Sequence, residues 1–148
     1  MANISIKLKT PKQVIDASML YGARKIRERI LVLFDYAGTE GVNAARLNGS
    51  YIDDTGNLRS SVGYSVVEDG KLIKVGEFAQ VKDGAEGIEQ GQKLAEQIAA
   101  EFPKGMTVVL LAGMPYASAL SARGYDVIDS GILKTRRLLP ELMKPFKN

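Results

Sequence analysis

The chain has 148 residues and contains no cysteine, no histidine and no tryptophan. Without cysteine the protein has no disulfides, no thiolate nucleophile and no zinc site of the Cys/His type. Without histidine it lacks the usual general base near neutral pH, and therefore every Ser-His-Asp arrangement. Any catalysis would have to use carboxylates, lysine, tyrosine or a carboxylate-bound metal.

Long apolar runs are also lacking. The longest ones cover residues 30–34 and 108–112, well short of the roughly 18 residues that a membrane-spanning helix needs. Residues 1–7 show no basic region followed by an apolar stretch and a small-residue cleavage site. We therefore expect no membrane partner and a cytoplasmic setting.

The composition is ordinary for a globular protein, with 45% hydrophobic and 25% charged residues. The length allows a sizeable core, so we expect a single domain over residues 1–148. The net charge is +3, and basic residues concentrate at 24–29 and at 134–147. Such patches can bind phosphate, but most charge runs form solvated faces. Nucleic acid is therefore kept as a partner, but it is not favoured.

The first half of the chain predicts a strand, a long helix and a hairpin. Residues 4–9 alternate between apolar and polar, which indicates a strand with one buried face. Thr10 as N-cap and Pro11 at the first helical position start a helix over residues 11–37. Gly38 is a plausible stop for that helix.

Residues 49–57 are rich in Gly, Asp, Asn and Ser/Thr, and they indicate a loop. Leu58 to Ser61 is ambiguous between a turn of helix and the beginning of a strand. Strands over 62–67 and 72–78 follow, joined by a turn at Asp69-Gly70. The Asp-Gly pair tolerates the positive φ angles that a type I′ turn needs.

The second half alternates helices and strands. The predicted elements, in order, are a helix over 85–102, a strand over 106–112, a short helix over 116–123, a strand over 124–128 and a final helix that is capped by Asp129 or Ser130. The nearly continuous apolar run of 106–112 predicts a central strand that is buried on both faces. Pro140 predicts a kink or break in the last helix.

Together these elements predict a single α+β domain. A long N-terminal helix and two further helices would pack on a mixed or antiparallel sheet of about four to five strands.

Few residues in this sequence suggest chemistry. Asp53-Asp54 is the only tight acidic pair, and paired carboxylates can hold magnesium or calcium. Neighbouring aspartates point apart in most conformations, so turn and cap roles fit them better. Gly84, Gly87 and Gly91 lack the phosphate-loop pattern and instead favour close packing of a helix. We predict no catalytic residue, no cofactor and no metal site, and we expect that the protein is not an enzyme. An enzyme with a carboxylate–metal centre is a third, weaker hypothesis.

Arg59, Tyr116 and Tyr125 are candidate interface residues. Arg59 lies between a turn and a strand, where its guanidinium could pair with Asp53 or Asp54. It could equally reach an acidic patch on a neighbouring subunit. The two tyrosines flank a stretch of small residues, and they would be either half-buried anchors or contacts at a subunit interface.

One segment resembles a known family. Thr55-Gly56-Asn57-Leu58-Arg59-Ser60-Ser61-Val62 is similar to the Thr-Gly-x-Leu-Arg-x-Ser-Ile/Val element of phage and prophage tail-completion, or head–tail joining, proteins of long-tailed phages. The long helix before it and the downstream Tyr116-Ala117 element add to this resemblance. The family's Tyr-Ala-x-x-x-Glu-x-Gly pattern is incomplete in this chain, because Tyr116 to Gly124 contains no glutamate.

The resemblance implies a virion structural protein that assembles into a homo-oligomeric ring. Its partners would be the phage connector, on the portal side, and the tail-tube proteins. It would be found in the virion, and in the cytoplasm of the bacterial host during assembly. The loops over 38–57 and 79–87 could become ordered only on assembly. The candidate interface residues are Asp53, Asp54, Thr55, Gly56, Leu58, Arg59, Tyr116 and Tyr125. The alternative is a small nucleic-acid- or protein-binding module that uses the basic C-terminal helix.

Overall fold

The computed structural model describes residues 11–147. The predicted strand over 4–9 and the Thr10 cap lie outside the described residues. The elements are α1 (Lys12–Asn48), α2 (Asn57–Ser60), β1 (Val62–Glu68), β2 (Lys71–Gly76), α3 (Ala85–Ile98), η1 (Ala99–Glu101), β3 (Met106–Ala112), α4 (Ala117–Ala122), α5 (Asp129–Leu142) and η2 (Lys144–Phe146). The fold is α+β, as predicted.

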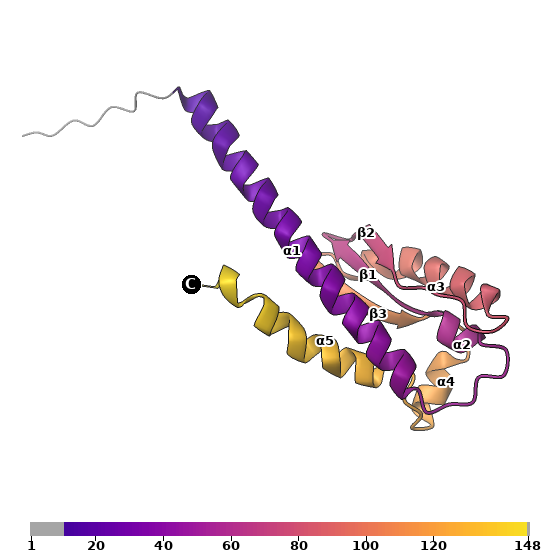
Figure 1. Cartoon of the computed structure of the whole chain (residues 1–148). Helices are drawn as coiled ribbons and strands as arrows, with labels where there is room; N and C mark the ends of the chain where they lie inside the picture. The colour runs from indigo at the N-terminus through magenta and orange to yellow at the C-terminus, as the bar shows by residue number, and fades with distance from the viewer. Residues whose placement is uncertain (1–10, 148) are drawn as a thin grey trace, which may run out of the picture.

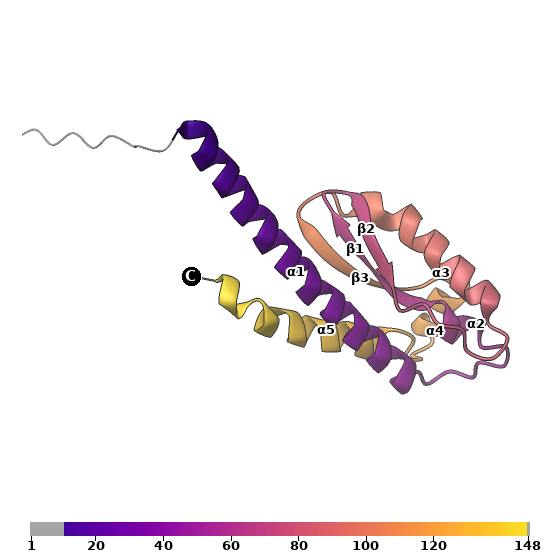
Figure 2. The same cartoon turned by 45° about the horizontal axis from the view of Figure 1, so that its top comes forward.

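The described strands form one antiparallel sheet in the order β2-β1-β3. Helices α1 and α5 lie on one side of this sheet, and α3 lies on the other (Figures 1 and 2). The main core forms between α1 and β1, where Phe34, Val42, Val62, Tyr64 and Val66 are buried.

The prediction for residues 106–112 was wrong in two respects. They form a strand, but that strand is at the edge of the sheet, and among its residues only Leu111 is buried. The central strand is β1, which is buried from Val62 to Val67. An apolar run favours a strand with covered faces, but it shows neither how far the faces are covered nor which edges are hydrogen-bonded.

The strand predicted over 124–128 does not form. Gly124 has a positive φ of 87°, and the chain turns there toward α5. The apolar residue Val127 is instead buried in a small cluster with Tyr51 and Leu58. The described residues therefore contain three strands, not four to five.

The hairpin between β1 and β2 is confirmed. Asp69 and Gly70 have φ values of 50° and 80°, the two positive angles that a type I′ turn requires. The short helix over 116–123 is also confirmed, as α4. The helix predicted over 85–102 appears as α3 followed by η1.

Helix α1 does not stop at Gly38 but continues to Asn48. Both Gly38 and Gly41 are places of close approach. A Cβ at Gly38 would lie 2.4 Å from the ring of Tyr64, and one at Gly41 would lie 2.1 Å from Oγ1 of Thr135. A glycine inside a helix costs about 1 kcal/mol relative to alanine. Burial of the continuing helix against β1 and α5 outweighs that cost.

Helix α5 begins at Asp129, but neither Asp129 nor Ser130 caps it, because both lie inside the helix and the N-cap position is Ile128. The helix continues for two residues beyond Pro140. Proline lacks an N–H and so removes one hydrogen bond, to the carbonyl four residues earlier. Here that loss falls in the last turn of the helix, and η2 follows after Met143.

Candidate assembly interface

The turn at residues 53–61 is held by the side chain of Asp53. Its carboxylate accepts hydrogen bonds from the N–H groups of Leu58 (3.4 Å) and Arg59 (2.9 Å). A carboxylate at this position satisfies N–H groups that have no partner inside the helix. Asp53 and Leu58 are both buried. Both residues therefore act inside the subunit. The N-cap position of α2 is Gly56, and the carboxylate of Asp53 supplies acceptors for N–H groups of that helix from outside it.

Glycines let this turn lie directly against α3. Gly56 has a φ of 83°, and a Cβ there would lie 1.9 Å from the carbonyl oxygen of Val81. Cβ atoms at Gly87 and Gly91 would approach neighbouring atoms to 2.0 Å and 2.2 Å. Gly87 and Gly91 therefore allow close packing of this helix, as predicted, but not directly on the strands. The neighbour at Gly87 is the carbonyl of Asn57 in α2, and the nearest neighbour at Gly91 is the ring of Phe78.

Arg59 does not pair with Asp53 or Asp54 through its side chain. Its guanidinium donates a hydrogen bond to the carbonyl of Gly49 (3.1 Å) and lies 4.7 Å from the ring centre of Tyr51. Tyr51 is buried, and burial raises the pKa of Tyr51 to about 12. Arg59 therefore ties the end of α1 to α2.

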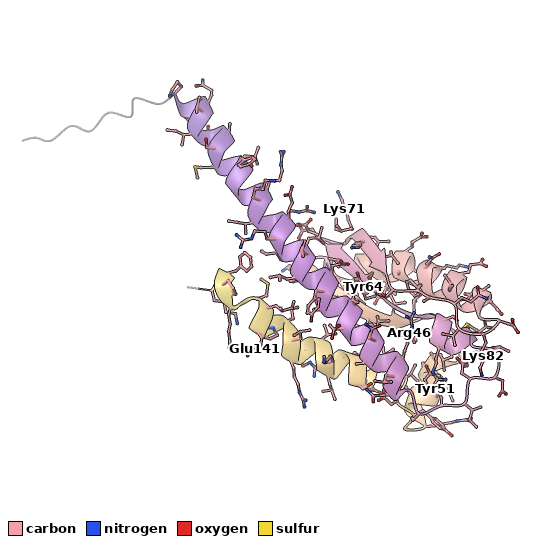
Figure 3. All side chains as sticks on the ribbon, viewed as in Figure 1. Arg46, Tyr51, Tyr64, Lys71, Lys82 and Glu141 are labelled. Carbon is pink, nitrogen blue, oxygen red and sulfur yellow. The ribbon has the colours of Figure 1, made fainter. Side chains whose placement is uncertain are left out.

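Arg46, in the last turn of α1, links four segments. Its guanidinium donates to the carbonyls of Arg59 (3.3 Å), Val62 (2.8 Å) and Glu77. Burial lowers the pKa of Arg46. Figure 3 shows Arg46 and Tyr51 at the same end of α1. Sequence reasoning missed Arg46, because nothing in its local pattern separates it from other basic residues of the helix.

The proposed ordering of loops 38–57 and 79–87 on assembly does not fit this structure. Residues 38–48 are helical. The second loop is anchored at Ser60, whose Oγ accepts a hydrogen bond from Val81 N–H (2.7 Å), and by Lys82, whose Nζ donates to the carbonyl of Asp53 (2.7 Å). Both segments are already held within one subunit, so they are not free to act as an assembly switch.

The remaining candidates are exposed. Tyr116 is 43% exposed and Tyr125 is 41% exposed. Burial of part of the ring raises the pKa of Tyr116. Asp54 and Thr55 are also exposed. Helices α2 and α4, which neighbour these residues in sequence, lie at the same end of the molecule (Figure 1). Of the eight candidates, Asp54, Thr55, Tyr116 and Tyr125 therefore offer side chains to a partner, whereas Asp53, Gly56 and Leu58 are buried.

Among residues 11–147, another group of exposed apolar side chains lies on the first part of α1. Residues 12–26, which we call the arm, project beyond the sheet in both views (Figures 1 and 2). Only Ile15 and Gly22 are even partly buried in the arm. Five of its large apolar side chains are at least half exposed: Val14, Met19, Leu20, Tyr21 and Ile26. Sequence reasoning predicted this helix but not its exposure. The available signal was that apolar residues occur on more than one face.

The arm and α3 carry opposite charge. The arm holds three basic residues and one acidic residue, which are Lys12, Arg24, Lys25 and Asp16. Helix α3 holds three acidic residues and one basic residue, which are Glu86, Glu89, Glu96 and Lys93. All eight side chains are exposed. Charge complementarity between two different surfaces of one chain favours head-to-tail contacts between copies.

Comparisons with family models, with curated proteins and with solved structures gave no match. Within residues 11–147, no group of three or more acidic side chains is arranged to hold a metal ion. None of the described helices has the length and apolar character needed to cross a membrane.

Proposed function

We propose that the protein is a structural subunit of a phage or prophage virion. It joins head and tail by assembling, with copies of itself, into a ring between the connector and the tail tube. The observation that carries this proposal is the arm, which exposes five large apolar side chains on a projecting helix. Large apolar side chains left exposed on one projecting helix offer surface that a partner can cover. The resemblance of residues 55–62 to tail-completion proteins supports a ring as the form of that assembly.

The mechanism would be geometric, not chemical. The hydrogen bonds of Asp53, Arg46 and Arg59 tie α1, α2 and β1 into one body. The arm extends from that body toward a neighbour. A contact between two different surfaces repeats from copy to copy, and it closes into a ring when the rotation between copies permits.

Solution mass tests the proposal. Size exclusion with light scattering, over a concentration series and at two salt levels, should give masses that climb from 16.1 kDa toward one discrete multiple. Ile26→Ser should weaken this assembly. Leu133→Ser is the matched control, because Ile26 and Leu133 are both 50% exposed but Leu133 lies on α5. If Ile26→Ser and Leu133→Ser have the same solution masses over the concentration series, the arm is not part of the interface.

A nucleic-acid-binding module is the second candidate. It is favoured by the exposure of Lys134, Arg136 and Arg137 on α5. This alternative requires binding to DNA or RNA that weakens steeply with salt, because contacts to phosphate release counterions. The assembly proposal expects no such binding. A titration of labelled duplex DNA and single-stranded RNA at two salt levels separates the two proposals.

A further inference from the structure

Strand β3 has one unpaired edge among the described residues. Two hydrogen bonds continue the β1–β3 ladder beyond its ends, from Gly113 N–H to Ser61 (3.1 Å) and from Asp69 N–H to Gly105 (3.0 Å). In an antiparallel pair, hydrogen-bonded positions alternate with positions whose N–H and C=O groups point away. The register therefore directs the backbone groups of alternate β3 residues to the open edge: Met106, Val108, Leu110 and Ala112.

The opposite edge of the sheet is protected and this one is not. Strand β2 carries Lys71 and Lys74, and its pairing with β1 contains an irregularity between Val66 and Val67. Charged residues and bulges are the usual means of blocking edge-to-edge pairing. Strand β3 reads Met-Thr-Val-Val-Leu-Leu-Ala, with no charge and no proline. Such a strand readily accepts another strand.

Apolar grooves flank the open edge of β3 on both faces of the sheet. On one face, a groove of about 590 Å³ lies between β3 and α5 and is lined by Leu110, Ile132, Leu139 and Met143 among others. On the other face, a groove of about 320 Å³ is lined by residues of α3, β3 and α4, including Ser118. Leu110 belongs to both grooves. An added strand would therefore place its two sets of side chains into two existing grooves.

Residues 4–9 of this chain have the pattern that such a site requires. Ile4, Ile6 and Leu8 alternate with Ser5, Lys7 and Lys9, so an extended segment has one apolar face and one polar face. The apolar face suits the groove beside α5. The polar face would lie on the side of the other groove, where Ser118 and Ser121 are the only polar members of a mostly apolar lining.

The same molecule cannot supply this segment along its own β3. Arg27 forms an ion pair with Glu68, which the register places opposite Met106, at one end of the sheet. From Arg27, α1 continues away from the sheet to Lys12 (Figure 2), over about 22 Å at 1.5 Å per residue. The three residue steps from Lys12 to Lys9 extend at most about 11 Å. Lys9 therefore falls short of its own sheet while α1 remains helical.

We propose that residues 4–9 of one copy add to the open edge of β3 in a neighbouring copy. The sheet of each subunit then gains a fourth strand. The inference rests on the proposed self-assembly and specifies one of its contacts. Donor and acceptor are different surfaces, so each copy can receive one strand and give another, as a closed ring requires.

A labelled peptide tests the acceptor site. The probe is a fluorescent peptide of residues 1–11, and its binding is followed by anisotropy. The receiving variant is the full-length double variant Ile6→Lys, Lys7→Ile, whose own segment 4–9 no longer alternates between apolar and polar residues. The control peptide carries the same exchange and so has the same composition and charge. We expect saturable binding of the native peptide and about tenfold weaker binding of the control. Equal binding of the two peptides, or no saturable binding, would overturn the proposal.

A change at the β3 edge gives a second readout. Val108→Pro, added to the receiving variant, removes one outward N–H without removing a bond to β1. It should weaken binding of the native peptide about tenfold. Val108→Ala keeps the N–H but shortens a side chain that lines the groove, so it is the matched control and should weaken binding clearly less than Val108→Pro does. Equal weakening by Val108→Pro and Val108→Ala would contradict pairing at this edge.

Failure of strand donation and failure of the proposed function are distinguishable. If the peptide does not bind and the native chain still assembles by light scattering, strand donation is wrong and the proposed function stands. If the peptide binds selectively and the native chain stays at 16.1 kDa at every concentration, the proposed self-assembly is wrong. The open edge of β3 is then still supported as a binding site for an added strand.

Discussion

The two parts of α1 have the same secondary structure but differ in how far their apolar side chains are buried. The docked part, residues 30–48, buries Phe34, Val42 and Ala45 against β1 and α5. The arm, residues 12–26, exposes side chains of similar apolar character. An isolated helix of about 15 residues is marginally stable in water. The arm therefore depends on its continuity with the docked part, and it would gain stability by packing against a partner.

This difference explains why one continuous helix is useful. The docked part fixes the direction of the arm, so that the arm is presented to a neighbour without being packed on its own subunit. A change in the docked part should therefore alter the free energy of unfolding. A change in the arm should alter assembly and leave unfolding almost unchanged.

The largest effect is expected from a pair of glycine substitutions. Gly38→Ala places a Cβ 2.4 Å from the ring of Tyr64, which is 1% exposed and whose hydroxyl donates a hydrogen bond to Asp35. Because the ring cannot move away, overpacking should cost about 2–3 kcal/mol of unfolding free energy. Gly22→Ala in the arm meets nothing within 4 Å and should raise helix stability by at most about 1 kcal/mol. Urea unfolding measures the free energy of unfolding of both variants. A loss of stability in Gly22→Ala would contradict an exposed arm.

An arginine pair should give an intermediate effect. Arg46→Ala removes the donor to three backbone carbonyls, and it should cost about 2 kcal/mol because partly buried acceptors lose their partner. Arg24→Ala, at an exposed position of the arm, should change stability by less than about 0.5 kcal/mol. Thermal unfolding of the two variants side by side measures the contrast. Similar shifts in Tm would mean that Arg46 does not hold the end of α1 in place.

The pairing of Asp35 with Lys74 should give the smallest effect. Burial raises the pKa of Asp35, but hydrogen bonds from Lys74 (2.7 Å) and from Tyr64 outweigh it and leave the pKa lowered. A lowered pKa adds stability above the ordinary value of 3.8, and this is lost as pH falls through the pKa of the folded state. The contribution should stay below about 1 kcal/mol, because the pair is partly exposed. Urea unfolding from about pH 5 to about pH 3 should show a smaller decline in Asp35→Asn than in the native protein. Parallel declines would contradict this role.

The parts of the fold that follow from local chemistry could be predicted from sequence. Asp69-Gly70 defines its turn through backbone angles alone. Gly38 was misread because a local stop signal says nothing about Tyr64, which lies 26 positions later and needs a glycine opposite its ring. Residues 106–112 were misplaced in the sheet because an apolar run shows neither the burial of the strand nor the pairing of its edges.

The candidate site could be predicted less well than the fold. The turn around Asp53 and Leu58 was identified, but the structure places both residues inside the subunit. The arm was missed as a surface because Met19 and Ile26 have the same helical spacing whether they contact their own core or another molecule. Only the three-dimensional arrangement, in which the sheet ends near Arg27, reveals that these side chains are exposed when residues 11–147 are considered.

Hydrogen exchange of α1 at increasing protein concentration tests the central claim most directly, because it compares the two parts of one helix in the native chain. Amides of the docked part should be protected at every concentration. Amides of the arm should exchange rapidly at low concentration and become protected as copies assemble. Rapid exchange of the arm at every concentration would contradict its role as an interface between subunits.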